Sequence, residues 1–264
     1  MKSETKKEII VTVVCSILVA TVSVASALIA RQEKSVYEVK PVPTFDLIKA
    51  ADYFPLKKGN SWSYAGTAVN ATAGGSEVQK EVELTMRVVD VVERRGVTFF
   101  IMEGHPADAA WALEEGDRSK RSVEIKPSKY GYLLISNKLF KIAEDKMSVV
   151  SAALQGDGFV GLDMLSEEDI EMEMPLFKGL RFGEIKQLGR ADLSYFWYVN
   201  DVTVFHDAEG DKIVRVPLYT VAQNTRPDYT EYTFRPYLGI TTYTYSHHGT
   251  KAHVELSLGE FSLH

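Results

Sequence analysis

Apolar and polar residues alternate along short stretches through most of this chain. The clearest stretch is residues 81–92, EVELTMRVVDVV, in which every second side chain is apolar over the first eight positions. A period of two is typical of a strand with one buried face. Arg94-Arg95-Gly96 then predicts a tight turn, after which residues 97–102 return as the partner strand.

The same alternation and the turn residues between the stretches predict further strands, at residues 122–126, 130–136, 138–141, 195–205, 212–222, 230–235, 240–245 and 252–261. One short helix is predicted at residues 143–154, because acidic residues open it and Gly156 follows it. Residues 156–171 are expected to be irregular. We therefore expect a mainly β fold, as a curved antiparallel sheet, an open barrel or a sandwich.

Residues 9–30 break this pattern, because they form a run of 22 residues without a charge. A helix of about 20 apolar residues spans a bilayer, so the run predicts a single transmembrane signal anchor. Two alternatives are a signal peptide cleaved after Ala27, where small residues precede the cut, and a buried helix of a soluble protein. The anchor predicts a cytoplasmic tail at residues 1–8, a stalk at 31–51 and an extracytoplasmic β domain at 52–264.

Charge and cysteine content narrow the classes of function. The net charge is −6, and no basic stripe is present, so nucleic acid is not an expected partner. The single cysteine, Cys15, lies in the apolar segment, so residues 31–264 cannot form a disulfide or a thiolate zinc site. No glycine-rich phosphate loop is present, and no cofactor is predicted. The expected location is the cell membrane, or outside the cell if the segment is cleaved.

Aromatic residues crowd the second half of the chain and form the candidate ligand site. Tyr243 and Tyr245 share one face of their predicted strand, and Tyr232 and Phe234 share one face of theirs. With Trp197 they predict a concave cleft for a lipid, a glycan or a peptide. The alternative is that these five residues are core and cross-strand packing.

Metal and catalytic sites are weaker hypotheses. His247, His248 and His253 gather near the last hairpin, but adjacent residues of a strand point to opposite faces. The acidic run at residues 167–173 lacks the pattern of a calcium-binding loop. No Gly-x-Ser-x-Gly motif is present. We therefore predict no metal ligands and no catalytic residues.

Residues 53–64, YFPLKKGNSWSY, carry a resemblance to known proteins. Lys57-Lys58-Gly59-Asn60 predicts a turn, and Trp62, expected to be buried, shares a strand face with Tyr64. The stretch resembles the opening motif of a loose group of exported, membrane-anchored bacterial and archaeal β domains of unknown function. Their Phe-Pro-Leu, Gly and Trp-x-Tyr pattern is followed by a Pro-Leu-x-x-Gly element, here at residues 175–179, although Phe182 stands where a Trp is common.

This resemblance implies an extracytoplasmic half-barrel similar to lipoprotein carriers, and it implies no catalytic residue. The repeated Pro-Leu element also suggests two related halves, residues 52–141 and 170–261. The expected function is non-enzymatic: binding of an apolar ligand or an envelope partner protein, or service as an envelope scaffold. The alternative is a hydrolase of envelope polymers whose site is not identified.

Overall fold

The computed structural model describes residues 50–71, 77–111, 122–156, 165–209 and 212–264. The chain divides into two units, Met1–Leu47 and Ile48–His264, and every described residue belongs to the second unit. The predicted anchor at residues 9–30 and nearly all of the stalk therefore lie outside the described residues. Among the described helices, none is long and apolar enough to cross a membrane.

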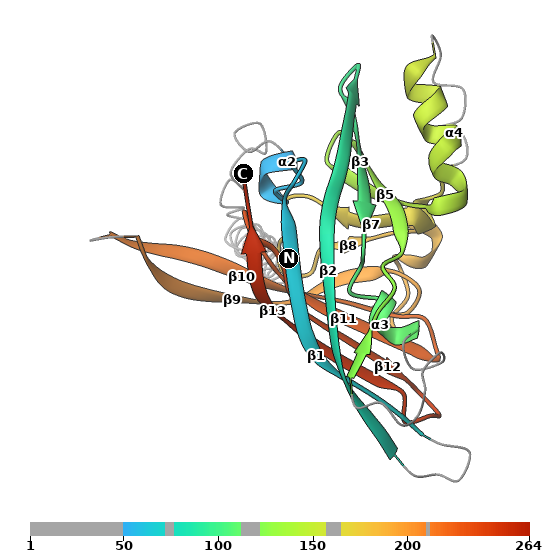
Figure 1. The fold of residues 1–264 in the computed structure, drawn as a ribbon, viewed down its shortest axis with the longest axis vertical. Helices are drawn as coiled ribbons and strands as arrows, with labels where there is room; N and C mark the ends of the chain where they lie inside the picture. Colours follow the sequence, from blue (N-terminus) through green and yellow to red (C-terminus); the bar gives the residue numbers. More distant parts are fainter. Residues whose placement is uncertain (1–49, 72–76, 112–121, 157–164, 210–211) are drawn as a thin grey trace, which may run out of the picture. The chain divides into compact units, whose positions relative to one another are not determined.

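Strands dominate the described residues, which confirms the mainly β prediction (Figure 1). The strands of the first half are β1 (Ser61–Ala71), β2 (Glu77–Arg94), β3 (Val97–Glu103), β4 (Ser122–Glu124), β5 (Lys129–Ile135), β6 (Lys138–Ala143) and β7 (Ile170–Glu173). Those of the second half are β8 (Arg181–Phe182), β9 (Trp197–Glu209), β10 (Lys212–Asn224), β11 (Asp228–Arg235), β12 (Gly239–His247) and β13 (His253–Ser262).

The strands form one curved, nearly closed sheet. Its order is β7-β6-β5-β3-β2-β1-β13-β12-β11-β10-β9-β8, and β4 pairs with β2 beside this path. All neighbours on the path are antiparallel, whereas β4 is parallel to β2. The first and last strands in chain order, β1 and β13, are therefore hydrogen-bonded to each other. The strands at the two ends of the sheet, β7 and β8, contact each other and nearly close it.

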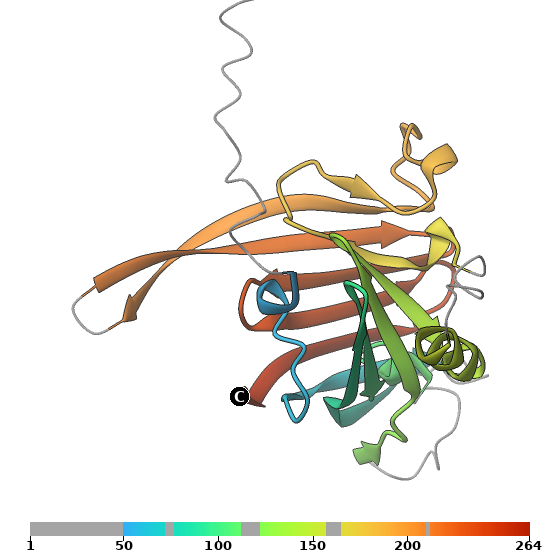
Figure 2. The ribbon, with the colours of Figure 1, turned by 90° about the horizontal axis from the view of Figure 1, so that it is seen from above.

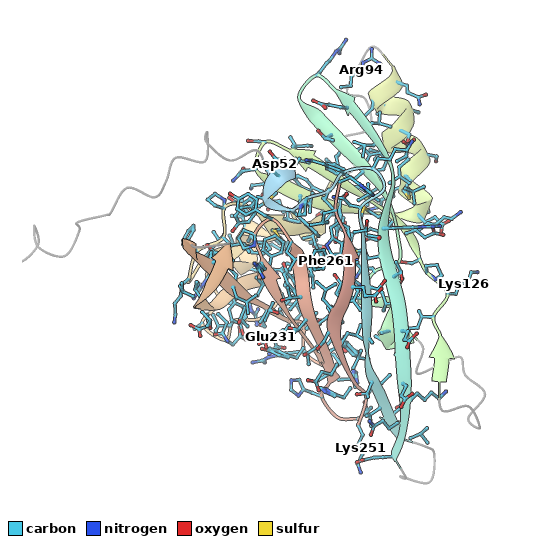
Figure 3. All side chains as sticks on the ribbon, turned by 60° about the vertical axis from the view of Figure 1, so that its left-hand side comes forward. Asp52, Arg94, Lys126, Glu231, Lys251 and Phe261 are labelled. Atoms are coloured by element: carbon cyan, nitrogen blue, oxygen red, sulfur yellow. The ribbon has the colours of Figure 1, made fainter. Side chains whose placement is uncertain are left out.

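Helices are few. They are α2 (Ala50–Tyr53), α3 (Asp108–Trp111) and α4 (Glu144–Gln155), with 3-10 turns at Glu167–Asp169 and Ile185–Gln187. The predicted helix at residues 143–154 is confirmed as α4, which packs Val150 and Leu154 on Phe99 of β3 and Leu133 of β5. Arg94, at the end of β2, also donates hydrogen bonds to the last carbonyl groups of α4, beside which it lies in Figure 3.

The inner face of the curved sheet is filled by aromatic side chains around Phe54. The ring of Phe54 contacts Trp62 of β1, Tyr132 of β5 and Phe234 of β11, with centroids 5.9, 6.1 and 5.4 Å away. Because these partners come from both halves of the sheet, the segment after α2 closes one end of the interior (Figure 2). The predicted burial of Trp62 is confirmed, since its side chain is 0% exposed.

The motif YFPLKKGNSWSY therefore acts as a plug followed by a turn. Tyr53, Phe54 and Leu56 are all buried. The turn then begins β1: the Gly59 N–H donates to the Val88 carbonyl of β2 at 3.0 Å. Gly59 has φ +91°, a conformation that glycine adopts without a steric penalty.

A turn with the same hydrogen-bond pattern follows Pro175-Leu176 and precedes β8. The Gly179 N–H donates to the Val199 carbonyl of β9 at 2.9 Å, and Gly179 has φ +85°. Lys178 pairs with Asp201 at 2.7 Å, just as Lys58 of the first turn pairs with Asp90 at 2.8 Å. The two turns also match in spacing. Asp90 lies two residues after Val88, and Asp201 lies two residues after Val199.

The segments that precede the two turns contact each other, because the Leu176 N–H donates to the Tyr53 hydroxyl at 3.2 Å. The relation between the halves 52–141 and 170–261 stays a prediction. Two strands escaped the sequence analysis: β7, where irregular chain was expected, and the two-residue β8.

Candidate functional site

The five aromatic residues predicted to line a cleft all lie on the inner face of the sheet. Tyr232 and Tyr243 are register partners on β11 and β12, and the Trp197 ring contacts Tyr232 with centroids 5.3 Å apart. Phe234 contacts the plug, and Tyr245, which is half-buried, donates a hydrogen bond to Asp228. The structure thus brings together the residues that the alternation placed on one face.

These side chains pack on one another and on the first half of the sheet. Phe234 is 0% exposed, Tyr232 is 2%, Tyr243 is 4% and Trp197 is 8% exposed. None of the five lies among the residues that line the groove described below. Their burial favours the packing alternative, and ligand binding by these five residues stays a prediction.

A polar cluster that the sequence analysis did not single out is buried beside them. His105 lies after β3, and its Nε2 atom is 3.6 Å from Oε1 of Glu171 on β7. Its Nδ1 atom accepts a hydrogen bond from the Ala107 N–H, which places the proton of the neutral ring on Nε2. The ring stands edge-on to Tyr130 and Tyr243.

Burial and neighbouring charge shift the pKa values of this pair. Burial, with the Lys141 ammonium, lowers the pKa of His105. Burial alone would raise the pKa of Glu171, but Lys141 and His105 outweigh it and hold that pKa below its usual value. His105 Nε2 and the Tyr132 hydroxyl are buried without a hydrogen-bond partner among the described residues.

The chemistry that this cluster can perform is limited by access. A histidine and a carboxylate are a common acid–base pair, but His105 is 3% exposed and Tyr132 is 0% exposed. The cluster is therefore part of the packed interior, and a polymer substrate has no access to its histidine. Glu171 is placed here by a bulge, because the register between β6 and β7 shifts at this residue.

The outer face of β1 carries a groove of about 970 Å³. Its floor is formed by Ser63 and Ala65 of β1 and Thr85 of β2, and Ile125 and Pro127 border it. The remaining lining residues are Tyr64, Glu83, Leu84, Arg87, Glu103, Gly259 and Glu260.

The sequence of β1 explains why the hollow forms there. Residues 61–68, SWSYAGTA, place Trp62 and Tyr64 on the buried inner face and Ser63 and Ala65 on the outer face. Small outer side chains leave space between the longer ones of the two flanking strands, β2 and β13. Gly259 adds to this space, because it is the extra residue of a bulge between Ser63 and Tyr64 on β1 and Glu260 and Leu258 on β13.

Charged side chains form the walls of the groove. Arg87 of β2 is ion-paired with Glu103 of β3, and Ser63 and Thr85 share a hydrogen bond of 3.1 Å across the floor. Glu83 and Glu260 are exposed on the two sides of β1, opposite Ala65 and Ser63 respectively. This arrangement can bind polar or charged groups but offers no buried acid–base pair.

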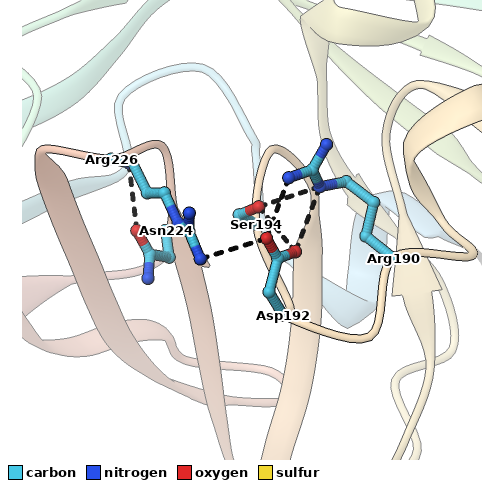
Figure 4. Close-up of polar contacts among 5 residues, drawn as sticks. All are labelled: Arg190, Asp192, Ser194, Asn224 and Arg226. Atoms are coloured by element: carbon cyan, nitrogen blue, oxygen red, sulfur yellow. Dashed lines mark hydrogen bonds and ion pairs between the residues drawn. The ribbon is translucent and has the colours of Figure 1, made fainter.

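A second polar cluster holds the loop before β9 against the turn after β10 (Figure 4). Arg190 forms two hydrogen bonds to the Asp192 carboxylate, and Arg226 contacts the same carboxylate at 3.2 Å. Arg190, with the Ser194 hydroxyl and Arg226, keeps the pKa of Asp192 well below its usual range. Since both guanidinium groups are engaged by one carboxylate, the cluster acts as a clasp.

The histidines of the last hairpin do not converge. His247 pairs with Asp228 through Nδ1 at 2.8 Å, whereas His253 pairs with Ser246 at 3.0 Å. Because His247 and Ser246 are adjacent in β12, the two pairs lie on opposite faces of the strand. Within the described part of the chain, no group of three or more His, Cys, Asp or Glu residues is arranged to hold a metal ion.

No family model matches this chain, and neither does any curated protein. Two solved structures are similar to it. A Bacteroides fragilis protein described as exported, with a YmcC-like fold, is 10% identical with a TM-score of 0.34, over 78% of this chain and 96% of that chain. A Parabacteroides distasonis protein described as a lipoprotein is 9% identical with a TM-score of 0.30, over 80% and 98%. Likeness at this level supports no functional conclusion.

Proposed function

We propose that this chain is a membrane-tethered, extracytoplasmic β domain that acts without catalysis, by binding a partner protein in the groove on the outer face of β1. The 22 uncharged residues at 9–30 support the tether and the export of the larger domain. The observation that carries the binding proposal is a contrast: the inner face is packed with buried aromatics, while the groove of about 970 Å³ is open on the outer face.

A partner protein suits the groove better than an apolar ligand does. Its lining mixes hydroxyl, carboxylate and guanidinium groups, whereas apolar ligands bury their surface against apolar walls. The second candidate is carriage of an apolar ligand by Trp197, Tyr232, Phe234, Tyr243 and Tyr245. It is supported by their common face, and it requires packed rings such as Trp197 and Tyr232 to separate.

Site-specific photo-cross-linking of the full chain in its native membrane tests the proposal. A photoreactive residue at position 65, on the groove floor, is expected to form a covalent adduct with one polypeptide. The control carries the photoreactive residue in place of Glu93, which is exposed outside the groove, and it is expected to give no such adduct. Equal adducts at both positions, or none at position 65, would contradict partner binding in the groove.

Mass spectrometry of the full chain purified in mild detergent tests the second candidate. The proposed function predicts no stoichiometric lipid or other apolar molecule with the protein. A stoichiometric apolar molecule that is lost in a Trp197→Ala variant would favour carriage on the inner face instead.

A further inference from the structure

The groove carries more carboxylates than cations. Glu83, Glu103 and Glu260 line it, and Arg87 is the one basic residue in the described lining. Arg87 is already ion-paired with Glu103. Lys126 lies beside the lining residue Ile125, but its side chain extends away from the sheet (Figure 3). Among the described lining residues, therefore, Glu83 and Glu260 face the groove with no cation of their own.

The two carboxylates stand on opposite sides of a strand-shaped floor. Glu83 on β2 is the register partner of Ala65, and Glu260 on β13 is the register partner of Ser63. The floor between them follows β1, an extended strand that rises by about 3.3 Å per residue. An occupant that follows this floor is an extended chain, and in such a chain alternate side chains point to the same side.

We infer that the groove receives an extended segment of the partner protein that bears lysine or arginine, laid along β1 with its cations at Glu83 and Glu260. This inference rests on the proposed function and adds the chemistry of the partner. Charge complementarity carries it, because opposite charges across a contact steer association and select the partner. The hydroxyl groups of Ser63 and Thr85 remain within the floor to bind backbone groups of the segment.

The test is a fluorescence-anisotropy titration of the full chain in detergent with a short labelled peptide in which lysine and serine alternate. A peptide in which glutamate replaces lysine is the control ligand. The wild-type chain is expected to bind the lysine peptide saturably and to bind the glutamate peptide at least tenfold more weakly. Raising the salt concentration is expected to weaken the lysine peptide's binding, since the charges are exposed.

The decisive variant is Glu83→Gln with Glu260→Gln. It is expected to weaken binding of the lysine peptide about fivefold, the effect of losing two exposed ion pairs. The matched control is Glu93→Gln with Glu144→Gln, which removes the same charge at exposed positions outside the groove lining. This control is expected to bind as the wild type does, which separates a site from general attraction to an acidic protein.

Three outcomes would overturn the inference: equal binding by the two double variants, equal binding of the two peptides, or saturable binding of a neutral oligosaccharide in place of the lysine peptide. If the cross-link at position 65 still identifies one polypeptide, the proposed function stands and the cationic segment alone is wrong. If the cross-link fails as well, both are wrong.

Discussion

The inner and outer faces of β1 differ sharply in burial. On the inner face Trp62 and Tyr64 are buried, and their polar atoms donate to the carbonyl groups of Leu238 and Ile240. On the outer face Ser63 and Ala65 form the floor of the groove. One strand thus packs the interior with one set of alternate residues and lines the groove with the other.

Because the two faces carry different residues, substitutions can change stability and groove binding separately. Inner substitutions are expected to change the free energy of unfolding and to leave groove binding by the folded chain unchanged. Outer substitutions are expected to change binding and to leave unfolding nearly unchanged. Inner changes are therefore expected to give the larger losses of stability, and changes at the groove to give the smaller ones.

The largest effect is expected for Trp62→Ala. The side chain is 0% exposed and contacts Phe54, so its truncation is expected to lower the free energy of unfolding by about 3–5 kcal/mol. The adjacent outer variant Ser63→Ala is expected to change it by less than about 0.5 kcal/mol. Urea unfolding of both variants followed by tryptophan and tyrosine fluorescence measures this, and comparable losses would contradict the assignment of faces.

A smaller effect is expected where two paired strands carry glycines. A Cβ atom at Gly66 of β1 would lie 1.9 Å from the Glu255 carbonyl oxygen of β13, whereas at Gly259 its nearest neighbour is the Ser63 carbonyl oxygen at 3.7 Å. Gly66→Ala is therefore expected to push the strands apart and to destabilise by about 3 kcal/mol.

Gly259→Ala is the matched change on the groove side. It is expected to cost less than about 1 kcal/mol, because ordinary contact distances remain. Thermal unfolding of both glycine variants checks the pair. If Gly259→Ala lowers the stability as much as Gly66→Ala does, the bulge at Gly259 is packed as tightly as the contact between Gly66 and β13.

The third prediction concerns alkaline pH. Burial raises the pKa of Tyr64, Tyr132 and Tyr232. A folded-state pKa above the unfolded value of about 10 means that the unfolded chain loses its protons first. The stability that these groups contribute is complete below pH about 10 and falls above it, by about 1.4 kcal/mol per pH unit for each tyrosine.

Urea unfolding at pH values on both sides of about 10 measures this slope. Tyr64→Phe is expected to reduce this slope by one tyrosine's share relative to the wild-type chain. A slope that does not change in Tyr64→Phe would place the alkaline sensitivity elsewhere.

The smallest effect on stability is expected at the groove wall. Arg87→Ala removes the ion pair with Glu103, and an exposed pair contributes about 0–1 kcal/mol. Chemical unfolding of Arg87→Ala and of Glu103→Gln is expected to show similar small losses that shrink at high salt. A loss above about 3 kcal/mol would mean that the wall is part of the core.

Much of the fold was predictable because apolar and polar residues alternate within single strands. The pattern of residues 81–92 identified β2 and its buried side, and the spacing of Trp62 and Tyr64 identified the inner face of β1. The strand β7 was missed because it is short and bulged at Glu171, so its alternation covers four residues. The strand β8, with two residues, carries no periodicity.

The groove could not be predicted for a different reason. Its lining comes from β1, β2, β3, the segment after β4 and β13, which the sheet brings together only when β13 pairs with β1. Ser63 and Glu260 are adjacent in the sheet, although nearly the whole domain separates them in sequence. The buried pair of His105 and Glu171 could not be predicted either, because Glu171 reaches His105 only through the path of β7 in the sheet.

The most direct test of binding on the outer face is a comparison of Ala65→Trp with the wild-type full chain, by titration with the labelled lysine–serine peptide. Ala65 is exposed on the groove floor, so the large side chain is expected to fill the groove and to change the free energy of unfolding by less than about 0.5 kcal/mol. Binding of the peptide to Ala65→Trp is expected to weaken at least tenfold while the unfolding midpoint stays unchanged. Equal affinity of the two proteins for the peptide would contradict binding on the outer face.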